Sequence, residues 1–370
     1  MSSLRPINCS EDSASVSRRV RVRASFSWDA NSAGVAPLVG RCDTASFMKI
    51  ILITPPGPST RTGNAVAALR WARILRRLNH RVTIAAEYAD EPVDAMVAIH
   101  AWRSAEAVRR FKLRYPQRPL IIQLSGTDIY HYINEDPAPT LRSMELADRL
   151  VALNSLAWRV VPKKFRNKLR VILQSAPKPS VPRQPSRRRV EISVIGHLRD
   201  VKDPLRAAEA VQLLSPTSRI RIVHIGRAYS DEWAARAKAE MAINPRYLWR
   251  DDVPREAVQK LLRRSHAMVL SSLSEGGANV VSEAIVAGVP ILASRMDGNA
   301  GLLGADYPGY FSVGDTKTLA RLLQRIEGDR RFVAKLRRAI TQRAALFRPE
   351  HEMAAWRRLL AELSAQSGSA

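Results

Sequence analysis

The sequence contains few cysteines and no long apolar run. Its two cysteines, Cys9 and Cys42, both precede Met48, so we expect neither a disulfide framework nor a cysteine metal site to hold the fold. No apolar run approaches the ~18 residues that a membrane-spanning helix needs, and the early Arg18-Arg19 pair is followed by further arginines instead of an apolar signal core. We therefore predict a cytoplasmic protein without an export signal or membrane insertion.

Acidic residues are scarce beside basic ones. Lys and Arg number 59, Asp and Glu 34, and the formal net charge is +25. This charge favours anionic partners, whether nucleic acid, a membrane surface or a phosphorylated small molecule, and by itself selects none of them. The arginines are spread over many predicted helices, and no RNA-binding aromatic signature or zinc-ligand spacing accompanies them. We therefore expect no nucleic-acid partner and no bound metal.

The apolar pattern divides the 370-residue chain into two domains of ordinary size. Residues 1–47 are rich in Ser, Arg and Ala without periodicity, and we expect this extension either to be disordered or to result from a misassigned start site, with Met48 as the true start. Residues 48–175 and 190–345 each alternate short apolar strands with amphipathic helices, which is typical of a doubly wound parallel sheet. The proline-rich, charged residues 176–189 predict a linker, and residues 346–370 predict a closing helix.

Short apolar runs bounded by turn residues predict the strands, and a period of 3.6 residues predicts the helices. The predicted strands are 49–54, 82–86, 96–100, 120–124, 150–153, 171–173, 191–195, 220–225, 267–270 and 290–293. The predicted helices cover 65–78, 316–326, 329–347 and 351–363, with further helices after Pro204, Asp231, Pro254 and Asn279.

The stretch from Ser271 to Ser294 combines a strand end, a glycine turn and a helix. Glu275 lies on the turn, Asn279 is predicted to cap the helix, and Glu283 lies about one turn inside it. Glycines let a backbone approach a ligand, and the free N–H groups of a first helical turn favour an anion such as phosphate. Both carboxylates are expected to face one cleft, where they suit sugar hydroxyls. The same pattern also fits an ordinary βαβ turn with two surface glutamates.

A second glycine turn follows the predicted strand 191–195 and carries two cations. Gly196 is followed by Arg199 and Lys202; Arg can grip phosphate oxygens bidentately, and Lys adds a point charge. Two α/β domains side by side leave a cleft at the carboxyl ends of their strands, where open sheets bind ligands. This loop is therefore predicted to bind phosphate at that cleft, unless it is an ordinary basic strand-to-helix loop.

The basic loop, followed later in the chain by the motif E-G-G-x-N-x-x-x-E, resembles the donor-binding domain of GT-B glycosyltransferases, particularly the family with the E-x7-E motif. The resemblance implies two Rossmann-like doubly wound parallel-sheet domains facing across a cleft, with the last helix crossing back onto the first domain. It implies that Arg199 and Lys202 neutralise the departing nucleotide diphosphate and that Glu283 binds the ribose hydroxyls. No Asp-x-Asp metal motif appears, so no cofactor is expected. The residues implied to face the donor sugar and diphosphate are Gly196, Glu275, Gly276, Gly277, Ala278 and Asn279.

Several strings in the first domain and at the start of the second resemble the selenosugar synthases of selenoneine biosynthesis. They are MKIILITPPGPSTRTGNAVAALRWARILRRL, AIHAWRS, LSGTDIY, VILQSAPK and GHLRDVKDP. The resemblance implies transfer of a hexosyl or N-acetylhexosaminyl group from a UDP-sugar, UDP-GlcNAc or UDP-glucose, to selenophosphate. A carbon–selenium bond forms, and UDP and phosphate are released. The partners would then be these two small substrates.

A small, multiply charged acceptor needs hydrogen-bond donors and positive charge more than aromatic rings. His100 ends a predicted strand, and Arg103 lies on the following turn. The histidine is expected either to orient the anion or to exchange a proton, unless it is a structural residue. The loop before the first helix is predicted to bind the acceptor, although a plain Pro/Gly loop also fits it, and Arg61 fits either substrate. The predicted acceptor residues are Ser59, Thr60, Arg61, Thr62, Gly63, Asn64, His100, Arg103 and Thr127. The predicted catalytic residues are Glu275, His100, Arg199 and Lys202.

Three other functions fit parts of the same pattern. An E-x7-E glycosyltransferase acting on a hydroxyl of a sugar, lipid or natural product would share the donor site. A nucleotide-sugar epimerase of the same fold would consume the donor without an acceptor. The net charge of +25 also fits a nucleic-acid-binding protein that uses the fold as a scaffold.

Overall fold

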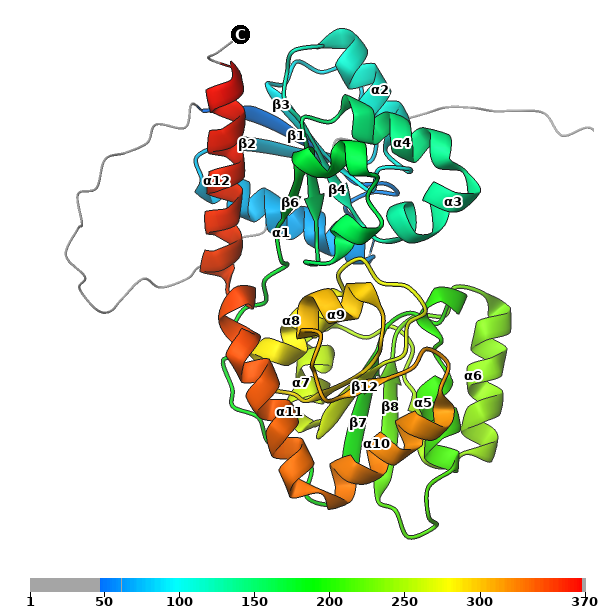
Figure 1. Ribbon diagram of the computed structural model, residues 1–370. Helices are drawn as coiled ribbons and strands as arrows, with labels where there is room; N and C mark the ends of the chain where they lie inside the picture. The colour runs from blue at the N-terminus through cyan, green and yellow to red at the C-terminus, as the bar shows by residue number, and fades with distance from the viewer. Residues whose placement is uncertain (1–46, 61, 368–370) are drawn as a thin grey trace, which may run out of the picture. The chain divides into compact units, whose positions relative to one another are not determined.

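In the computed structural model, which describes residues 47–60 and 62–367, the chain forms two six-stranded sheets with helices packed on them (Figure 1). Every strand pairing in both sheets is parallel. The predicted α/β architecture with two doubly wound sheets is therefore confirmed. Residues 1–46, which make up nearly all of the predicted extension and include both cysteines, lie outside the described residues.

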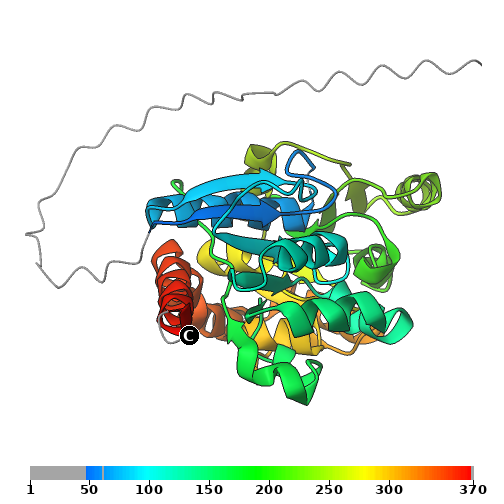
Figure 2. The ribbon, with the colours of Figure 1, turned by 90° about the horizontal axis from the view of Figure 1, so that it is seen from above.

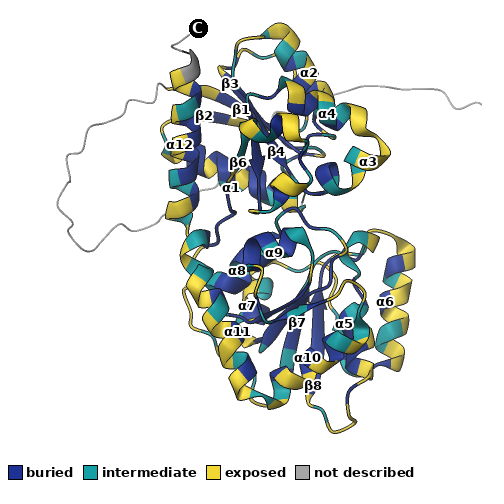
Figure 3. Ribbon diagram, in the orientation of Figure 1, coloured by how far each residue is buried: buried dark blue, intermediate teal, exposed yellow. Residues whose placement is uncertain are grey.

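The first domain contains the sheet β2-β1-β3-β4-β5-β6. Its strands are β1 (Lys49–Ile53), β2 (Arg81–Ala85), β3 (Ala95–Ile99), β4 (Leu120–Leu124), β5 (Arg149–Ala152) and β6 (Leu169–Val171). Its helices are α1 (Gly63–Arg77), α2 (Ala105–Arg114), α3 (Ile133–Glu135) and α4 (Pro137–Leu146), with a π-helical turn at Asp128–Tyr132 and 3-10 turns at Ala157–Arg159 and Lys163–Lys168. Strands β3 and β4 are buried along their whole length (Figure 3). Helices cover both faces of a parallel sheet, and this is why these strands read as almost continuous apolar runs.

The second domain contains the sheet β12-β11-β10-β7-β8-β9. Its strands are β7 (Val190–Ile195), β8 (Ile220–Ile225), β9 (Tyr247–Trp249), β10 (Ala267–Leu270), β11 (Ile291–Ser294) and β12 (Tyr310–Phe311). Its helices are α5 (Arg206–Gln212), α6 (Asp231–Ile243), α7 (Arg255–Arg264), α8 (Asn279–Val286), α9 (Asp297–Leu303), α10 (Thr316–Gly328) and α11 (Arg330–Arg343), with 3-10 turns at Asp200–Lys202 and Ala344–Phe347.

Helices α2, α3 and α4 of the first domain have no counterpart among the predicted elements. In the second domain, three elements have none. Strands β9 and β12 have three and two residues, too few to show an alternating pattern. Helix α9 has the sequence DGNAGLL, whose two glycines and asparagine favour a turn. Each of the three depends on tertiary contacts: Phe311 and Leu302, for example, are buried in the core of the second domain.

Helix α12 (Pro349–Ser367) follows the second domain in the chain and packs on the first (Figures 1 and 2). Trp356, Leu359, Leu360 and Leu363 belong to the apolar cluster that contains α1 and one face of the first sheet. The Trp356 ring meets the Trp71 ring edge to face, with centroids 4.7 Å apart. Such aromatic pairs stabilise by more than their buried area alone, so α12 is part of the core of the first domain.

Candidate functional site

The loops that follow the strands of both sheets surround one cleft of about 600 Å³. From the first domain these loops follow β1, β3, β4, β5 and β6, and from the second they follow β7, β8, β9 and β10. Two predicted residues are exceptions: Arg61 lies outside the described residues, and Glu283 is not among the lining residues. The predicted residues that line the cleft are Ser59, Thr60, Thr62, Gly63, Asn64, His100, Arg103, Thr127, Gly196, Arg199, Lys202, Glu275, Gly276, Gly277, Ala278 and Asn279.

Glu275 and Lys202 form an ion pair inside the cleft. The Lys202 ammonium donates a hydrogen bond to Oε1 of Glu275, and the Ser272 hydroxyl donates to the same oxygen over 2.8 Å. Glu275 is only 7% exposed, and a buried carboxylate requires such partners. The cation predicted to meet the diphosphate and the carboxylate predicted to meet the sugar therefore contact one another directly.

The glycines of the Glu275 turn lie against the backbone of the first domain. A Cβ on Gly276 would be 2.2 Å from the carbonyl oxygen of Ser125, and one on Gly277 would be 2.4 Å from Cβ of Leu153. The Asn154 side chain also donates to the Gly276 carbonyl over 2.7 Å. The sequence predicted these glycines for the approach of a ligand, and in the structure they permit the close approach of the two domains.

The prediction that Asn279 caps helix α8 is wrong. The cap position belongs to Ala278, and Asn279 is the first helical residue. Its Oδ1 accepts a hydrogen bond from Nη1 of Arg70 over 2.8 Å, and its Nδ2 donates to the Gly63 carbonyl over 3.3 Å. Both partners are more than 200 positions away in the chain, so no local pattern could have indicated them.

Glu283 lies in the second turn of α8, set back from the cleft. Its side chain is 25% exposed, and Nη2 of Arg255 is 3.6 Å from its Oε1. Burial raises the pKa of this carboxyl, and the charges of Arg255 and Arg70 partly offset that rise. The groups that surround Glu283 therefore come from both domains.

His224, which the sequence did not single out, holds the glycine turn at Gly196. Burial lowers its pKa to about 4, so the imidazole is neutral at pH 7. The Gly196 carbonyl can only accept; Nε2 therefore donates to it over 3.0 Å, and the Tyr247 hydroxyl donates to Nδ1 over 2.9 Å. A Cβ on Gly226 would be 1.9 Å from the same carbonyl oxygen. His224 and Gly226 thus hold in place the start of the loop that carries Arg199 and Lys202.

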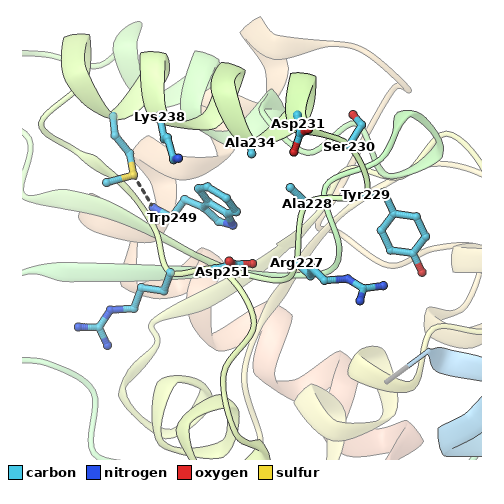
Figure 4. Close-up of a pocket in the computed structure, with 11 residues that line it drawn as sticks. Arg227, Ala228, Tyr229, Ser230, Asp231, Ala234, Lys238, Trp249 and Asp251 are labelled. Atoms are coloured by element: carbon cyan, nitrogen blue, oxygen red, sulfur yellow. Dashed lines mark hydrogen bonds between the residues drawn. The ribbon is translucent and has the colours of Figure 1, made fainter. Parts of the chain in front are cut away.

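An aromatic ring that the sequence also missed lies among the cations of the second domain. The guanidinium carbons of Arg199 and Arg227 are each 5.5 Å from the ring centre of Tyr229, within the range of cation–π attraction. Arg227 and Tyr229 line both the cleft and a neighbouring pocket of about 580 Å³ between α6 and β9, where Trp249 lies (Figure 4). No motif surrounds these two residues, and only the fold brings them to Arg199.

Side-chain hydroxyl groups form hydrogen bonds that stabilise the loop before α1. Oγ1 of Thr62 caps α1 by accepting from the Ala65 amide over 3.3 Å, and the Thr60 hydroxyl donates to the Gly57 carbonyl over 2.8 Å. The amino-terminal end of α1, with Gly63 and Asn64, lines the cleft. The free N–H groups of such a helix start favour an anion.

His100 has both ring nitrogens engaged within the first domain. Nδ1 accepts from the Arg103 amide over 3.2 Å, so the ring proton is on Nε2, which donates to the Thr127 hydroxyl over 2.8 Å. Burial lowers the pKa of His100, Arg103 lowers it further, and Asp128 opposes them. Its backbone φ of 76° lies in the left-handed region that a histidine rarely adopts. A neutral imidazole held in this way orients Thr127.

The described residues 47–60 and 62–367 contain no cluster of three or more His, Cys, Asp or Glu side chains that could hold a metal ion. Within the same ranges, no helix has the length and apolar character needed to cross a membrane.

Residues 182–346 match the family model described as "Glycosyl transferases group 1". The chain is 29% identical over 147 residues to the UDP-Gal:alpha-D-GlcNAc-diphosphoundecaprenol alpha-1,3-galactosyltransferase of Escherichia coli, a match that covers 37% of this chain and 36% of that protein. It is 30% identical over 148 residues to Glycosyltransferase 1 domain-containing protein 1 of Xenopus tropicalis, covering 39% of this chain and 43% of that protein. The chain therefore spans less than half the length of these relatives.

Solved structures share the fold of both domains. Anabaena Alr3699/HepE in complex with UDP has a TM-score of 0.70 at 14% identity, over 85% of this chain and 100% of that one. Sucrose-phosphate synthase from Thermosynechococcus elongatus has a TM-score of 0.71 at 13% identity, over 86% of this chain and 99% of that one. At such identities the likeness shows the fold alone. Residues 182–346 are therefore similar to group 1 glycosyl transferases, in a chain that has the GT-B fold.

Proposed function

We propose that the chain is a UDP-sugar-dependent glycosyltransferase that transfers a hexosyl or N-acetylhexosaminyl group to selenophosphate. One observation carries the proposal: a single cleft joins a cationic wall to a small polar one. Arg199, Lys202 and Arg227 line the wall from the second domain, where guanidinium and ammonium groups suit a diphosphate. Hydroxyl groups, the start of α1 and Arg103 line the other wall, to which the described part of the first domain contributes no Phe, Tyr or Trp. That wall suits a compact anion better than a sugar ring or a lipid chain.

The comparisons support a UDP-sugar as the donor, for which we propose UDP-glucose or UDP-GlcNAc. HepE, a structural neighbour, is solved with UDP, with UDP and glucose, and with UDP-glucose, and the name of the Escherichia coli relative specifies UDP-Gal. In this chain, Glu283 would bind the ribose hydroxyls, and Glu275 with the turn up to Asn279 would face the donor sugar. This assignment keeps the residues that the sequence resemblance implied.

In the proposed reaction, selenium bonds to the anomeric carbon as the bond from that carbon to the UDP oxygen breaks. UDP leaves with the bonding electrons, and Arg199 and Lys202 stabilise the charge that develops on its diphosphate. The selenium nucleophile is already largely deprotonated at neutral pH, so the transfer needs no strong general base. Water then cleaves the phosphorus–selenium bond, which releases phosphate and leaves selenium on the sugar.

The test is incubation of the purified chain with UDP-GlcNAc or UDP-glucose and enzymatically made selenophosphate, followed by mass spectrometry. We expect a product with the selenium isotope pattern and stoichiometric UDP. A reaction without selenophosphate is the matched control. The absence of both selenosugar and UDP would contradict the proposal.

The same assay separates the alternatives. Transfer to a sugar, lipid or natural-product hydroxyl, but not to selenophosphate, would identify an ordinary E-x7-E glycosyltransferase; the lipid-linked acceptor in the name of the Escherichia coli relative favours this as the second candidate. Consumption of the donor without any acceptor would identify an epimerase. Tight, salt-dependent binding of DNA or RNA without affinity for UDP-sugars would identify a nucleic-acid-binding protein.

A further inference from the structure

One arginine of the first domain reaches the helix that carries Glu283. Arg70 lies in α1, which meets both α8 and α12 (Figure 1). Nη1 of Arg70 donates to Oδ1 of Asn279 over 2.8 Å, and its side chain is 14% exposed. Nη2 is buried and has no hydrogen-bond partner among the described residues. The guanidinium thus lies between the domains, and its charge acts on Glu283.

A buried carboxylate fixes the other side of this arginine. Glu352, at the start of α12, is fully buried. Its Oε1 accepts from Nε of Arg70 over 3.1 Å and from the Trp71 indole over 2.8 Å, and its Oε2 accepts from the Ser175 amide and hydroxyl. With four donors on one carboxylate, Arg70 has little freedom to leave its position.

Asn279 transmits this position to Glu283. Asn279 is the first residue of α8, and Glu283 follows it by four residues, so the two lie on one face of the helix. The amide of Asn279 is held on both sides, by Arg70 and by the Gly63 carbonyl. A displacement of Asn279 should therefore rotate or shift the Glu283 carboxylate, which lies one helical turn further along.

We propose that Arg70 is a positioning residue for the donor site: anchored by Glu352, it seats the start of α8 through Asn279 and acts on Glu283 with its charge. The inference rests on the proposed function, because it takes Glu283 as the group that binds the nucleotide ribose. It adds a contribution from the first domain to a site otherwise assigned to the second.

The experiment measures UDP affinity by calorimetry between pH 5 and pH 8. Arg70→Gln should weaken binding about tenfold, the loss expected for one hydrogen bond to a charged group. It should also raise the pH at which binding is lost on acidification, by roughly half a unit, since one of the two cations that oppose the raised pKa of Glu283 is gone. Arg70→Lys keeps the positive charge but loses the planar set of guanidinium donors. It should therefore bind UDP more weakly, while the pH at which binding is lost stays at the wild-type value.

Two further variants complete the test. Arg77→Gln removes an exposed charge from the same helix and should match the wild type. If Arg70→Gln does not fold because Glu352 is left unpaired, Arg70→Gln/Glu352→Gln removes both charges and should show the same two effects. Wild-type affinity in Arg70→Gln, or in the double variant where Arg70→Gln does not fold, overturns the inference. A loss of affinity in that same variant without the pH shift also overturns it, because a loosened domain contact does not titrate. A wild-type chain that binds no UDP would instead contradict the proposed function.

Discussion

At the scale of single residues, Lys202 pairs with one anionic group, Glu275, and is proposed to bind a second, the donor diphosphate. Its ammonium pairs with Glu275 in a nearly buried position, and the proposed diphosphate would draw on the same ammonium. The Glu275 carboxylate supplies the counter-charge for the partly buried ammonium. It also links the sugar side and the phosphate side of the donor site through one contact.

Replacing Lys202 by Met should therefore lower kcat/KM for the UDP-sugar by roughly 100-fold, the loss typical of one group that stabilises transition-state charge. The measurement is the rate of UDP release at varied donor concentration. Lys317→Met, at an exposed position in α10, is the control and should keep the wild-type value. A Lys202→Met enzyme within a factor of two of the wild type would contradict the donor assignment.

His100 should affect binding of the acceptor more than chemistry. Its imidazole is neutral and donates to Thr127, so His100→Asn should raise KM for selenophosphate about tenfold, the effect of one misplaced hydrogen bond to an anion, and change kcat little. Because burial lowers the pKa of His100 below the ordinary 6.5, kcat should not vary with the protonation of His100 between pH 7 and pH 8. A pH dependence of kcat in that range that disappears in His100→Asn would show that the histidine exchanges a proton.

At the scale of elements, the turn between β10 and α8 serves as a domain contact as well as a candidate ligand loop. Gly276 faces the Ser125 carbonyl, and Asn154 bonds to the Gly276 carbonyl from the first domain. In addition, a Cβ on Gly298, which lies in α9, would be 1.8 Å from the Glu275 carbonyl oxygen. The turn is thus enclosed by backbone on two sides, and its shape depends on both domains.

Gly276→Ala should destabilise the fold by ~1–3 kcal/mol, the usual effect of forcing extra volume into a packed site. The added methyl group must push Ser125 away, and the two domains with it. Urea unfolding measures the change. Gly328→Ala, at the end of α10 with nothing within 4 Å of the added Cβ, is the matched control. Equal stability of the two variants would show that the domains do not meet at Gly276.

The sequence predicted the elements with strong patterns and missed those that depend on distant partners. The Glu275 turn, the Gly196 loop and the loop before α1 came from local glycine and charge patterns, and the structure brings them to one cleft. Asn279 was misread as a cap because its partner, Arg70, lies in another domain. His224 and Tyr229 carry no motif, and their contacts with Gly196 and Arg199 appear only when neighbouring strands align. Local rules therefore locate loops, whereas the support beneath them is a product of the fold.

At the scale of the whole molecule, four histidines have lowered pKa values because they are buried: His80, His100, His224 and His266. Each binds its proton less readily in the folded than in the unfolded chain. The free energy of unfolding must therefore fall as the pH drops below about 6.5, the unfolded value. For His224 this loss continues down to its folded pKa of about 4.

Unfolding in urea at pH 7 and pH 5 should show this loss, to which His224 alone contributes ~2 kcal/mol. His224→Gln should reduce the difference between the two pH values by about that amount, since glutamine does not titrate. His351→Gln, at an exposed position in α12, should leave the difference unchanged. A pH dependence identical in wild type and His224→Gln would contradict the assignment.

The return of α12 to the first domain has a consequence for synthesis on the ribosome. Trp71 is completely buried, and its edge-to-face partner Trp356 comes 285 positions later, after the entire second domain. Translation runs from the amino to the carboxyl end, so the first domain is synthesised before α12. This face of α1 therefore stays uncovered until the second domain has left the exit tunnel and α12 can pack on it. The two domains therefore complete their cores in the order opposite to the one in which they are synthesised.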